Sequence, residues 1–176
     1  MSENSSMAKG YSIPGIAMMA GATILLTMLL MAFSNFGTGD AARAANVSDR
    51  LTLPVILHLV TVIPALPLGA YILFRRKGDR LHRFLGRTWG SLMMITAITS
   101  FWLGRSDGTG LFGTHLSFIH IFAVITLVSV PLGVWQARIG NIKEHYRAMQ
   151  GPYIGLIIAG IFAFIPGRIM GSLVFG

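Results

Sequence analysis

Five long apolar stretches, separated by short polar or basic connectors, constrain this chain of 176 residues more than any other feature. A helix that crosses a bilayer needs about 20 mainly apolar residues, because the hydrocarbon layer is roughly 30 Å thick. We expect the spans at about 13–36, 51–74, 84–103, 116–135 and 152–174. The sequence therefore predicts an all-α membrane protein with five transmembrane helices, in which spans two to five form a four-helix core.

The composition agrees with this architecture. Only 11% of the residues are charged and 53% are hydrophobic, whereas a soluble domain carries about 25% charged residues. The chain has no cysteine, which excludes disulfides, thiolate nucleophiles, iron–sulfur clusters and haem attached through a Cys-x-x-Cys-His motif. We expect residues 1–12 to form a polar tail and residues 13–176 to form a single membrane domain.

The positive charge of the chain is distributed unequally between the two faces of the predicted bundle. With the amino terminus on the more basic face, that face holds Lys9, Arg75, Arg76, Lys77, Arg80, Arg83, Arg87, Arg138, Lys143 and Arg147. The opposite face holds Arg43, Arg50, Arg105 and Arg168. Because cytoplasmic loops of membrane proteins are rich in Lys and Arg, we expect a bacterial inner-membrane protein with a cytoplasmic amino terminus and a periplasmic carboxyl terminus. Its net charge of +8 then reflects topology and contact with membrane lipid, and does not indicate nucleic-acid binding.

Four histidines occupy matched positions in the predicted core. Histidine inside an apolar span is costly and usually faces the protein interior. His58 and His120 lie near the starts of the second and fourth spans, at one membrane face. His82 and His145 lie in basic connectors just before the third and fifth spans, at the other face. A four-helix bundle with this order places one pair of imidazoles near each face.

Two neutral imidazoles from diagonally placed helices suit a haem held between them. The second and fourth spans would hold one such pair, and the third and fifth spans the other. Two stacked haems would form an electron path across the bilayer. If a single haem is bound, we expect it at His58 and His120, which lie deepest in the apolar sequence.

The order of helices and histidines resembles the five-sixty-one-type transmembrane cytochromes b, in topology and histidine placement, over residues 51–173. The four core helices of those proteins contribute one histidine each to two b haems. The resemblance implies that His58 and His120 coordinate one haem b and that His82 and His145 coordinate the other.

Several short motifs also have a family likeness. They are His58 followed by Pro64, Leu68 and Gly69; Leu81-His82-Arg83-Phe84-Leu85-Gly86-Arg87; His145-Tyr146-Arg147-Ala148-Met149; and Pro166-Gly167-Arg168. They are similar to an uncharacterised bacterial membrane family, the domain of unknown function numbered twenty-three-oh-six. This resemblance implies a multi-pass bacterial membrane protein with shared histidines, and it implies no particular activity.

Arginines near the span ends are candidates to bind haem propionates, because a planar guanidinium group pairs well with a carboxylate. Arg105 and Arg168 lie at one face, and Arg83 and Arg87 at the other. The alternative is that these side chains reach from the span ends to the polar interface.

Each histidine also has a simpler interpretation. His58 and His120 would hydrogen-bond a nearby Ser or Thr, His82 would contact anionic lipid headgroups, and His145 would lie at the end of an amphipathic helix.

Small residues in the third and fifth spans, namely Gly86, Gly90, Gly155 and Ala159, either permit tight helix packing or leave room for a flat cofactor. Several aromatic residues lie near span ends, as in the aromatic belts of membrane proteins. They are Trp89, Trp102, Trp135, Tyr71 and Tyr153. Three prolines, Pro54, Pro64 and Pro67, predict a kink in the second span.

Two functions remain open on these grounds. The first is a b-type haem electron carrier, linked to quinone as a candidate redox cofactor, whose status as an oxidoreductase stays undecided. The second is a non-enzymatic accessory or assembly subunit of a larger respiratory or photosynthetic membrane complex. A transporter has less support, because the spans contain no acidic residue for a proton relay.

Overall fold

The computed structural model describes residues 51–103 and 120–164, with five isolated helical positions between residues 20 and 30. The two continuous segments form four helices, α3 (Leu53–Phe74), α4 (Arg80–Ser100), α5 (His120–Arg138) and α6 (Ile142–Ala163), and contain no β-strand. The predicted all-α class is therefore confirmed for this part of the chain. The polar tail at 1–12, most of the first expected span at 13–36, and residues 165–174 of the fifth lie outside the described residues.

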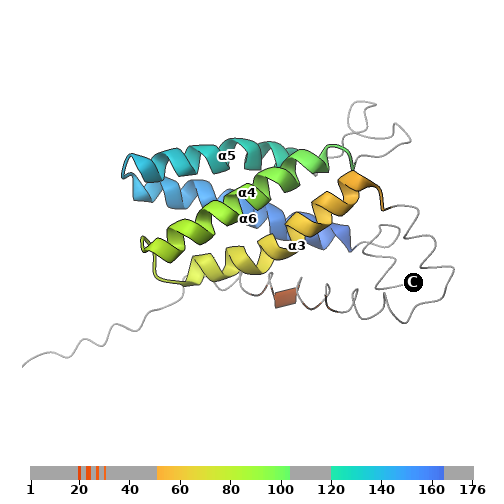
Figure 1. Ribbon diagram of the computed structural model, residues 1–176, viewed down its shortest axis with the longest axis horizontal. Helices are drawn as coiled ribbons and strands as arrows, with labels where there is room; N and C mark the ends of the chain where they lie inside the picture. Colours follow the sequence, from red (N-terminus) through yellow and green to blue (C-terminus); the bar gives the residue numbers. More distant parts are fainter. Residues whose placement is uncertain are drawn as a thin grey trace, which may run out of the picture.

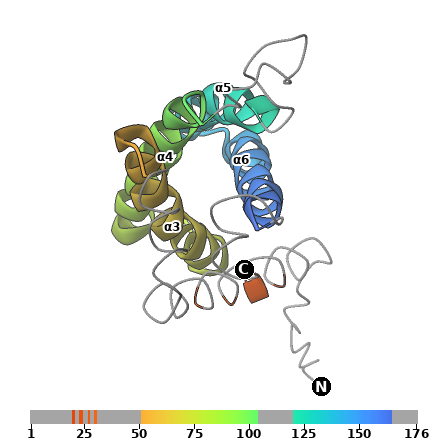
Figure 2. The same ribbon diagram turned by 90° about the vertical axis from the view of Figure 1, so that its right-hand side faces the viewer.

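The four helices follow one another around an antiparallel bundle. Figure 2, which views the bundle end-on, shows them in the order α3, α4, α5, α6, and each helix packs against the next in the chain. This order makes α3 diagonal to α5 and α4 diagonal to α6. The α3–α4 and α5–α6 connections both lie at the same end of the bundle (Figure 1). We name this end, formed by residues 75–83 and 138–147, the basic end.

The two connections at the basic end are built alike. Gly78 and Gly140 adopt φ values of 87° and 81°, a left-handed conformation that glycine adopts without steric cost. The next residue in each case caps a helix with its side chain: Asp79 accepts a hydrogen bond from the backbone N–H of His82 at 2.6 Å, and Asn141 accepts one from Glu144 at 3.4 Å.

These caps start both helices before the apolar sequence begins. Helix α4 starts at Arg80, where the third span was expected at 84, and α6 starts at Ile142, where the fifth was expected at 152. The expectation that His82 and His145 lie in connectors is therefore wrong, because each lies in the first turn of a helix. The Gly78-Asp79 and Gly140-Asn141 pairs carried this signal.

Two of the described helices, α3 and α5, are long and apolar enough to cross a membrane. Helices α4 and α6 begin with charged turns, which contain Arg80, Arg83, Lys143 and Glu144.

Helix α3 continues through Pro64 and Pro67 and changes direction near its middle, as the prolines predicted (Figure 1).

A contact among three helices forms the centre of the core. Trp89 on α4 donates its indole N–H to the carbonyl oxygen of Ala65 at 3.0 Å, and Tyr153 on α6 donates its hydroxyl to that of Leu66 at 3.3 Å. The two rings are tilted against each other with centroids 6.4 Å apart, and Gly69 on α3 lies against both. A side chain at this position would occupy the space that the two rings fill.

The aromatic side chains therefore divide into two groups. Trp89 and Tyr153, expected in aromatic belts, are buried in the core at 5% and 1% exposure, which corrects that expectation. Trp102, Trp135 and Tyr71 are more than half exposed and lie at helix ends, where the belt interpretation still applies.

Gly69→Ala is expected to destabilise the protein by about 1–3 kcal/mol, because overpacking a core forces neighbouring side chains to move. A Cβ atom at Gly69 would lie 2.6 Å from the Tyr153 ring and 2.7 Å from Trp89 Nε1. Thermal unfolding of the detergent-purified variants, followed by circular dichroism, measures the effect. Gly151→Ala is the matched control, since its Cβ would meet only Ile125, at 3.9 Å. Equal unfolding midpoints for the two variants would contradict this account of the core.

Candidate functional site

His58 lies against α4 at the end of the bundle opposite the basic end. Its Nδ1 is 3.1 Å from the carbonyl oxygen of Thr96 and 3.3 Å from the hydroxyl oxygen of Thr99. A Thr partner is the simpler interpretation that the sequence allowed. Donation of the Nδ1 proton to the Thr96 carbonyl leaves the lone pair of Nε2 outside this contact.

Sequence reasoning did not find the threonines that support His58. The Thr96 hydroxyl donates to the Thr61 hydroxyl at 2.8 Å, which links α4 to α3. Thr61 also donates to the carbonyls of Leu57 and His58 on its own helix, at 2.9 and 3.1 Å. The signal was present as isolated threonines within apolar stretches, where interhelical hydrogen bonds are common.

His120 also contacts α4, but through its other ring nitrogen. It is buried at the start of α5, with Nε2 3.0 Å from the carbonyl oxygen of Ser100 and its ring centroid 5.6 Å from that of Phe101. A nitrogen that donates its proton to a carbonyl does not coordinate a metal at the same time. The expected pair of His58 and His120 thus lies at one end of the bundle, with each ring hydrogen-bonded separately to the last turns of α4.

At the basic end, His145 is held in a defined orientation by α5. Its Nδ1 is 2.8 Å from the carbonyl oxygen of Gly133. Because a carbonyl only accepts, Nδ1 carries the proton and Nε2 keeps a lone pair. Histidines that bind metals are commonly oriented by a hydrogen bond of this kind.

His82 lies close enough to His145 for their charges to interact. Its Nδ1 is buried and has no hydrogen-bond partner among the described residues. Burial lowers the pKa of His82 below its ordinary value of 6.5, and the neighbouring charges of His145 and Arg75 act in the same direction. His82 precedes both the apolar part of α4 and the expected third span. The structure thus brings together the second predicted histidine pair at the basic end.

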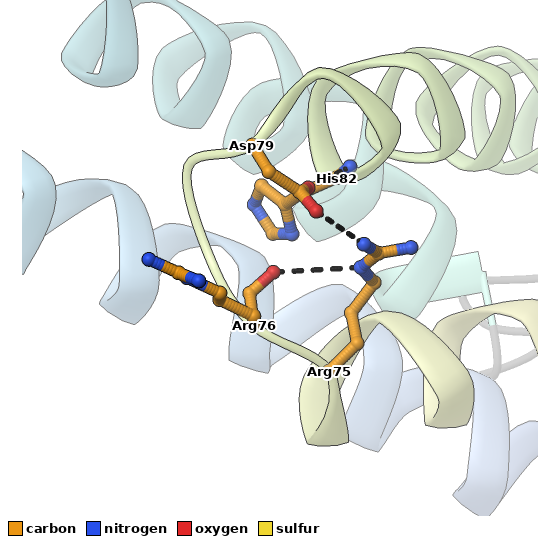
Figure 3. A network of polar contacts seen from close by, with 4 residues as sticks. All are labelled: Arg75, Arg76, Asp79 and His82. Atoms are coloured by element: carbon orange, nitrogen blue, oxygen red, sulfur yellow. Dashed lines mark hydrogen bonds and ion pairs between the residues drawn. The ribbon is translucent and has the colours of Figure 1, made fainter.

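The α3–α4 connection surrounds His82 with a polar network (Figure 3). Arg75 donates from Nη2 to the Asp79 carboxylate at 2.5 Å and from Nε to the carbonyl of Arg76 at 3.4 Å. The hydrogen bond from the His82 backbone N–H and the positive charge of Arg75 hold the pKa of Asp79 below its ordinary value of 3.8.

A cation–π contact joins this connection to α6. The ammonium group of Lys77 lies 4.4 Å from the centroid of the Tyr146 ring, a distance at which the ring face attracts a cation. Two of the motifs noted in the sequence, residues 81–87 and 145–149, therefore meet at the basic end although they are far apart in the chain.

The predicted arginines contribute less to this geometry. Arg83 and Arg87 are exposed on α4, and Arg147 pairs with Glu144 at 2.8 Å. Arg105 and Arg168 lie outside the described residues. The anchoring of propionates by these four candidates remains a prediction.

The small residues serve two different purposes. Cβ atoms built at Gly90 and Gly155 would lie 3.4 Å from Val130 and 3.0 Å from Phe122, so both glycines permit close helix packing. A Cβ at Gly86 would meet no atom within 4 Å, and Gly86 is one turn after His82 on the same helix face. Gly86 therefore leaves this face of α4 open beside His82.

The family described as a predicted membrane protein (DUF2306) matches residues 55–171. The chain belongs to this family. The match spans α3 to α6 and all four histidines, and it confirms the family likeness read from the motifs. The protein is therefore a helical membrane protein in contact with lipid, whereas its likeness to the cytochromes b remains a prediction. No curated protein and no solved structure matches the chain.

Asp79→Ala is expected to lower the thermal unfolding midpoint at neutral pH, because it removes the cap of α4 and the partner of Arg75. A carboxylate whose native pKa is depressed stabilises the protein above its ordinary value of 3.8 and loses that effect as the pH falls through the native pKa. The difference between wild type and variant should therefore shrink below that pH.

Asp79→Asn is the matched control for this prediction. Its amide oxygen can still cap α4, although the ion pair with Arg75 is lost, so its midpoint should lie between those of the wild type and Asp79→Ala. A wild-type advantage over Asp79→Ala that persists unchanged in acid would show that the carboxylate charge is not responsible.

Proposed function

We propose that this DUF2306 protein is a b-type haem-binding electron carrier of the membrane, with a haem held between α4 and α6 by His82 and His145. The observation that carries the proposal is that both imidazoles lie in first helical turns at the basic end, near enough for their charges to interact. They come from diagonal helices (Figure 2), the arrangement in which a bundle can place ligands on both faces of a flat cofactor.

The surrounding residues have separate roles in this proposal. The Gly133 carbonyl fixes the orientation of His145 and leaves Nε2 as its ligand atom. Gly86 leaves space beside His82, and Arg83 and Arg87 supply positive charge for propionates. A bound b haem would supply reversible transfer of one electron.

The geometry favours the basic end over the opposite end for the first haem. His120 directs Nε2 at the Ser100 carbonyl, so a metal bond from this nitrogen would replace a hydrogen bond, whereas His58 engages only Nδ1. This reverses the sequence-based preference, which relied on depth in the apolar sequence. A second haem at His58 and His120 would extend the path from one end of the bundle to the other, and quinone is then a candidate partner of the carrier.

We further propose five spans in a bacterial inner membrane, with a cytoplasmic amino terminus and a periplasmic carboxyl terminus. Both connections at the basic end are rich in Lys and Arg, which supports a cytoplasmic position for this end. The sequence for the remaining three spans lies at residues 13–36, 84–103 and 152–174.

A dithionite-reduced minus air-oxidised absorbance spectrum, with haem quantified as the pyridine haemochrome, tests the haem proposal on protein purified in detergent. We expect about one haem b per chain, or about two if both pairs are occupied. His82→Ala and His145→Ala should each abolish the site at the basic end. Arg138→Gln, a change at the exposed last residue of α5, is the matched control and should retain the haem.

Two results would contradict this assignment. Haem lost only in His58→Ala and His120→Ala would move the site to the opposite end of the bundle. Colourless but folded wild-type protein, produced with an adequate haem supply, would overturn the electron-carrier function. Co-purification with a stoichiometric membrane complex would then favour the accessory-subunit alternative.

A further inference from the structure

Two polar atoms at the basic end are buried without a hydrogen-bond partner in the described part of the chain. They are Nη1 of Arg75 and Nδ1 of His82, and a third such atom, the acceptor Oε1 of Gln136, lies two residues before the end of α5. Arg75 follows the last residue of α3, and His82 lies in the first turn of α4, so the two atoms come from opposite sides of one connection. Nη1 belongs to a charged group, and Nδ1 is a donor in the tautomer that carries its proton there. A buried donor without an acceptor is unfavourable, above all on a charged group.

Two acceptors of the α3–α4 connection, the Asp79 carboxylate and the Arg76 carbonyl, are already in use. Asp79 accepts from Arg75 Nη2 with one carboxylate oxygen and from the His82 backbone N–H with the other. The carbonyl of Arg76 accepts from Arg75 Nε. Asp79 already accepts from one backbone N–H at the start of α4, and the side-chain atoms Nη1 of Arg75 and Nδ1 of His82 still lack a partner among the described residues.

The charge of this segment favours an anion. Residues 75–83 contain the cations Arg75, Arg76, Lys77, Arg80 and Arg83 and the single acid Asp79. Five positive charges and one negative charge give a net charge of +4 with His82 neutral. Arg76, Lys77, Arg80 and Arg83 are exposed, and they lie directly before the apolar part of α4, where an interfacial position is expected.

We propose that the α3–α4 connection binds a phosphate group, which accepts hydrogen bonds from Arg75 Nη1 and His82 Nδ1. Phosphate supplies several acceptor oxygens and matches the geometry of a guanidinium group. Acidic phospholipid headgroups and free phosphate share this chemistry, and basic segments beside membrane helices attract acidic lipids. The site does not depend on haem, because donation from Nδ1 leaves Nε2 of His82 outside the contact.

The test measures thermal stabilisation of the full chain in a neutral detergent. Phosphatidylglycerol, phosphatidylcholine and inorganic phosphate are titrated separately into the wild type, Arg75→Lys and Arg138→Gln. The Lys variant keeps a cation beside Asp79 but has no second nitrogen for the ligand. Arg138→Gln removes an equal charge from the other connection of the same end and serves as the control.

We expect a saturable rise in the unfolding midpoint of the wild type and of Arg138→Gln, with an apparent affinity roughly tenfold weaker in Arg75→Lys, because hydrogen bonds to charged groups are the stronger ones. Stabilisation by phosphatidylglycerol alone identifies a lipid headgroup as the ligand, and stabilisation by inorganic phosphate identifies a soluble anion. Either result supports the site.

Equal apparent affinities for wild type and Arg75→Lys would overturn the proposal, as would equal stabilisation by phosphatidylcholine and phosphatidylglycerol with no response to inorganic phosphate. If circular dichroism shows that Arg75→Lys does not fold, Arg75→Gln replaces it, since this change also removes Nη1 but keeps all four histidines. The haem absorbance of Arg75→Lys is recorded in parallel. Because this variant retains all four histidines, a lost phosphate response with retained haem separates the two proposals.

Discussion

The hydrogen bonds from Trp89 and Tyr153 to two adjacent carbonyls of α3 hold the bundle together. An apolar surrounding cannot satisfy an indole N–H or a phenol O–H, so each of these groups must find an acceptor within the protein. Here the acceptors belong to Ala65 and Leu66, beside the prolines of α3. One helix thereby fixes the positions of two others, and the absence of a side chain at Gly69 lets the rings approach its backbone.

The same requirement for a partner explains why the four histidines are not equivalent. His58 and His120 find carbonyl partners on α4, and His145 finds one on α5. His82 Nδ1 has none among the described residues. The basic end thus combines an oriented imidazole, an imidazole with an unsatisfied nitrogen and a cation-rich connection. This combination supports both the proposed haem ligation and the proposed phosphate contact, through different atoms.

Sequence reasoning predicted the helical class, the family and the placement of one histidine pair at each end. Its second span, expected at 51–74, closely matches α3 at Leu53–Phe74. Sequence reasoning failed where short-range capping competes with hydropathy. The apolar sequence of the fifth span begins well after His145, but the cap at Asn141 starts α6 at Ile142. A capping side chain and a left-handed glycine define a helix start without any apolar residue. It also assigned Trp89 to the membrane interface, since hydropathy carries no information on which face of a helix meets a neighbour.

The amino-acid sequence by itself determined that the chain is a helical membrane protein and that its basic residues gather at one end of the bundle, because both properties follow from the order of apolar and charged residues along the chain. Only the tertiary structure decided which nitrogen of each histidine is engaged, that His82 approaches His145, and that Trp89 and Tyr153 form the core. These outcomes depend on the rotation of each helix about its axis. That rotation is set by side-chain packing between helices and by the requirement that buried polar groups form hydrogen bonds.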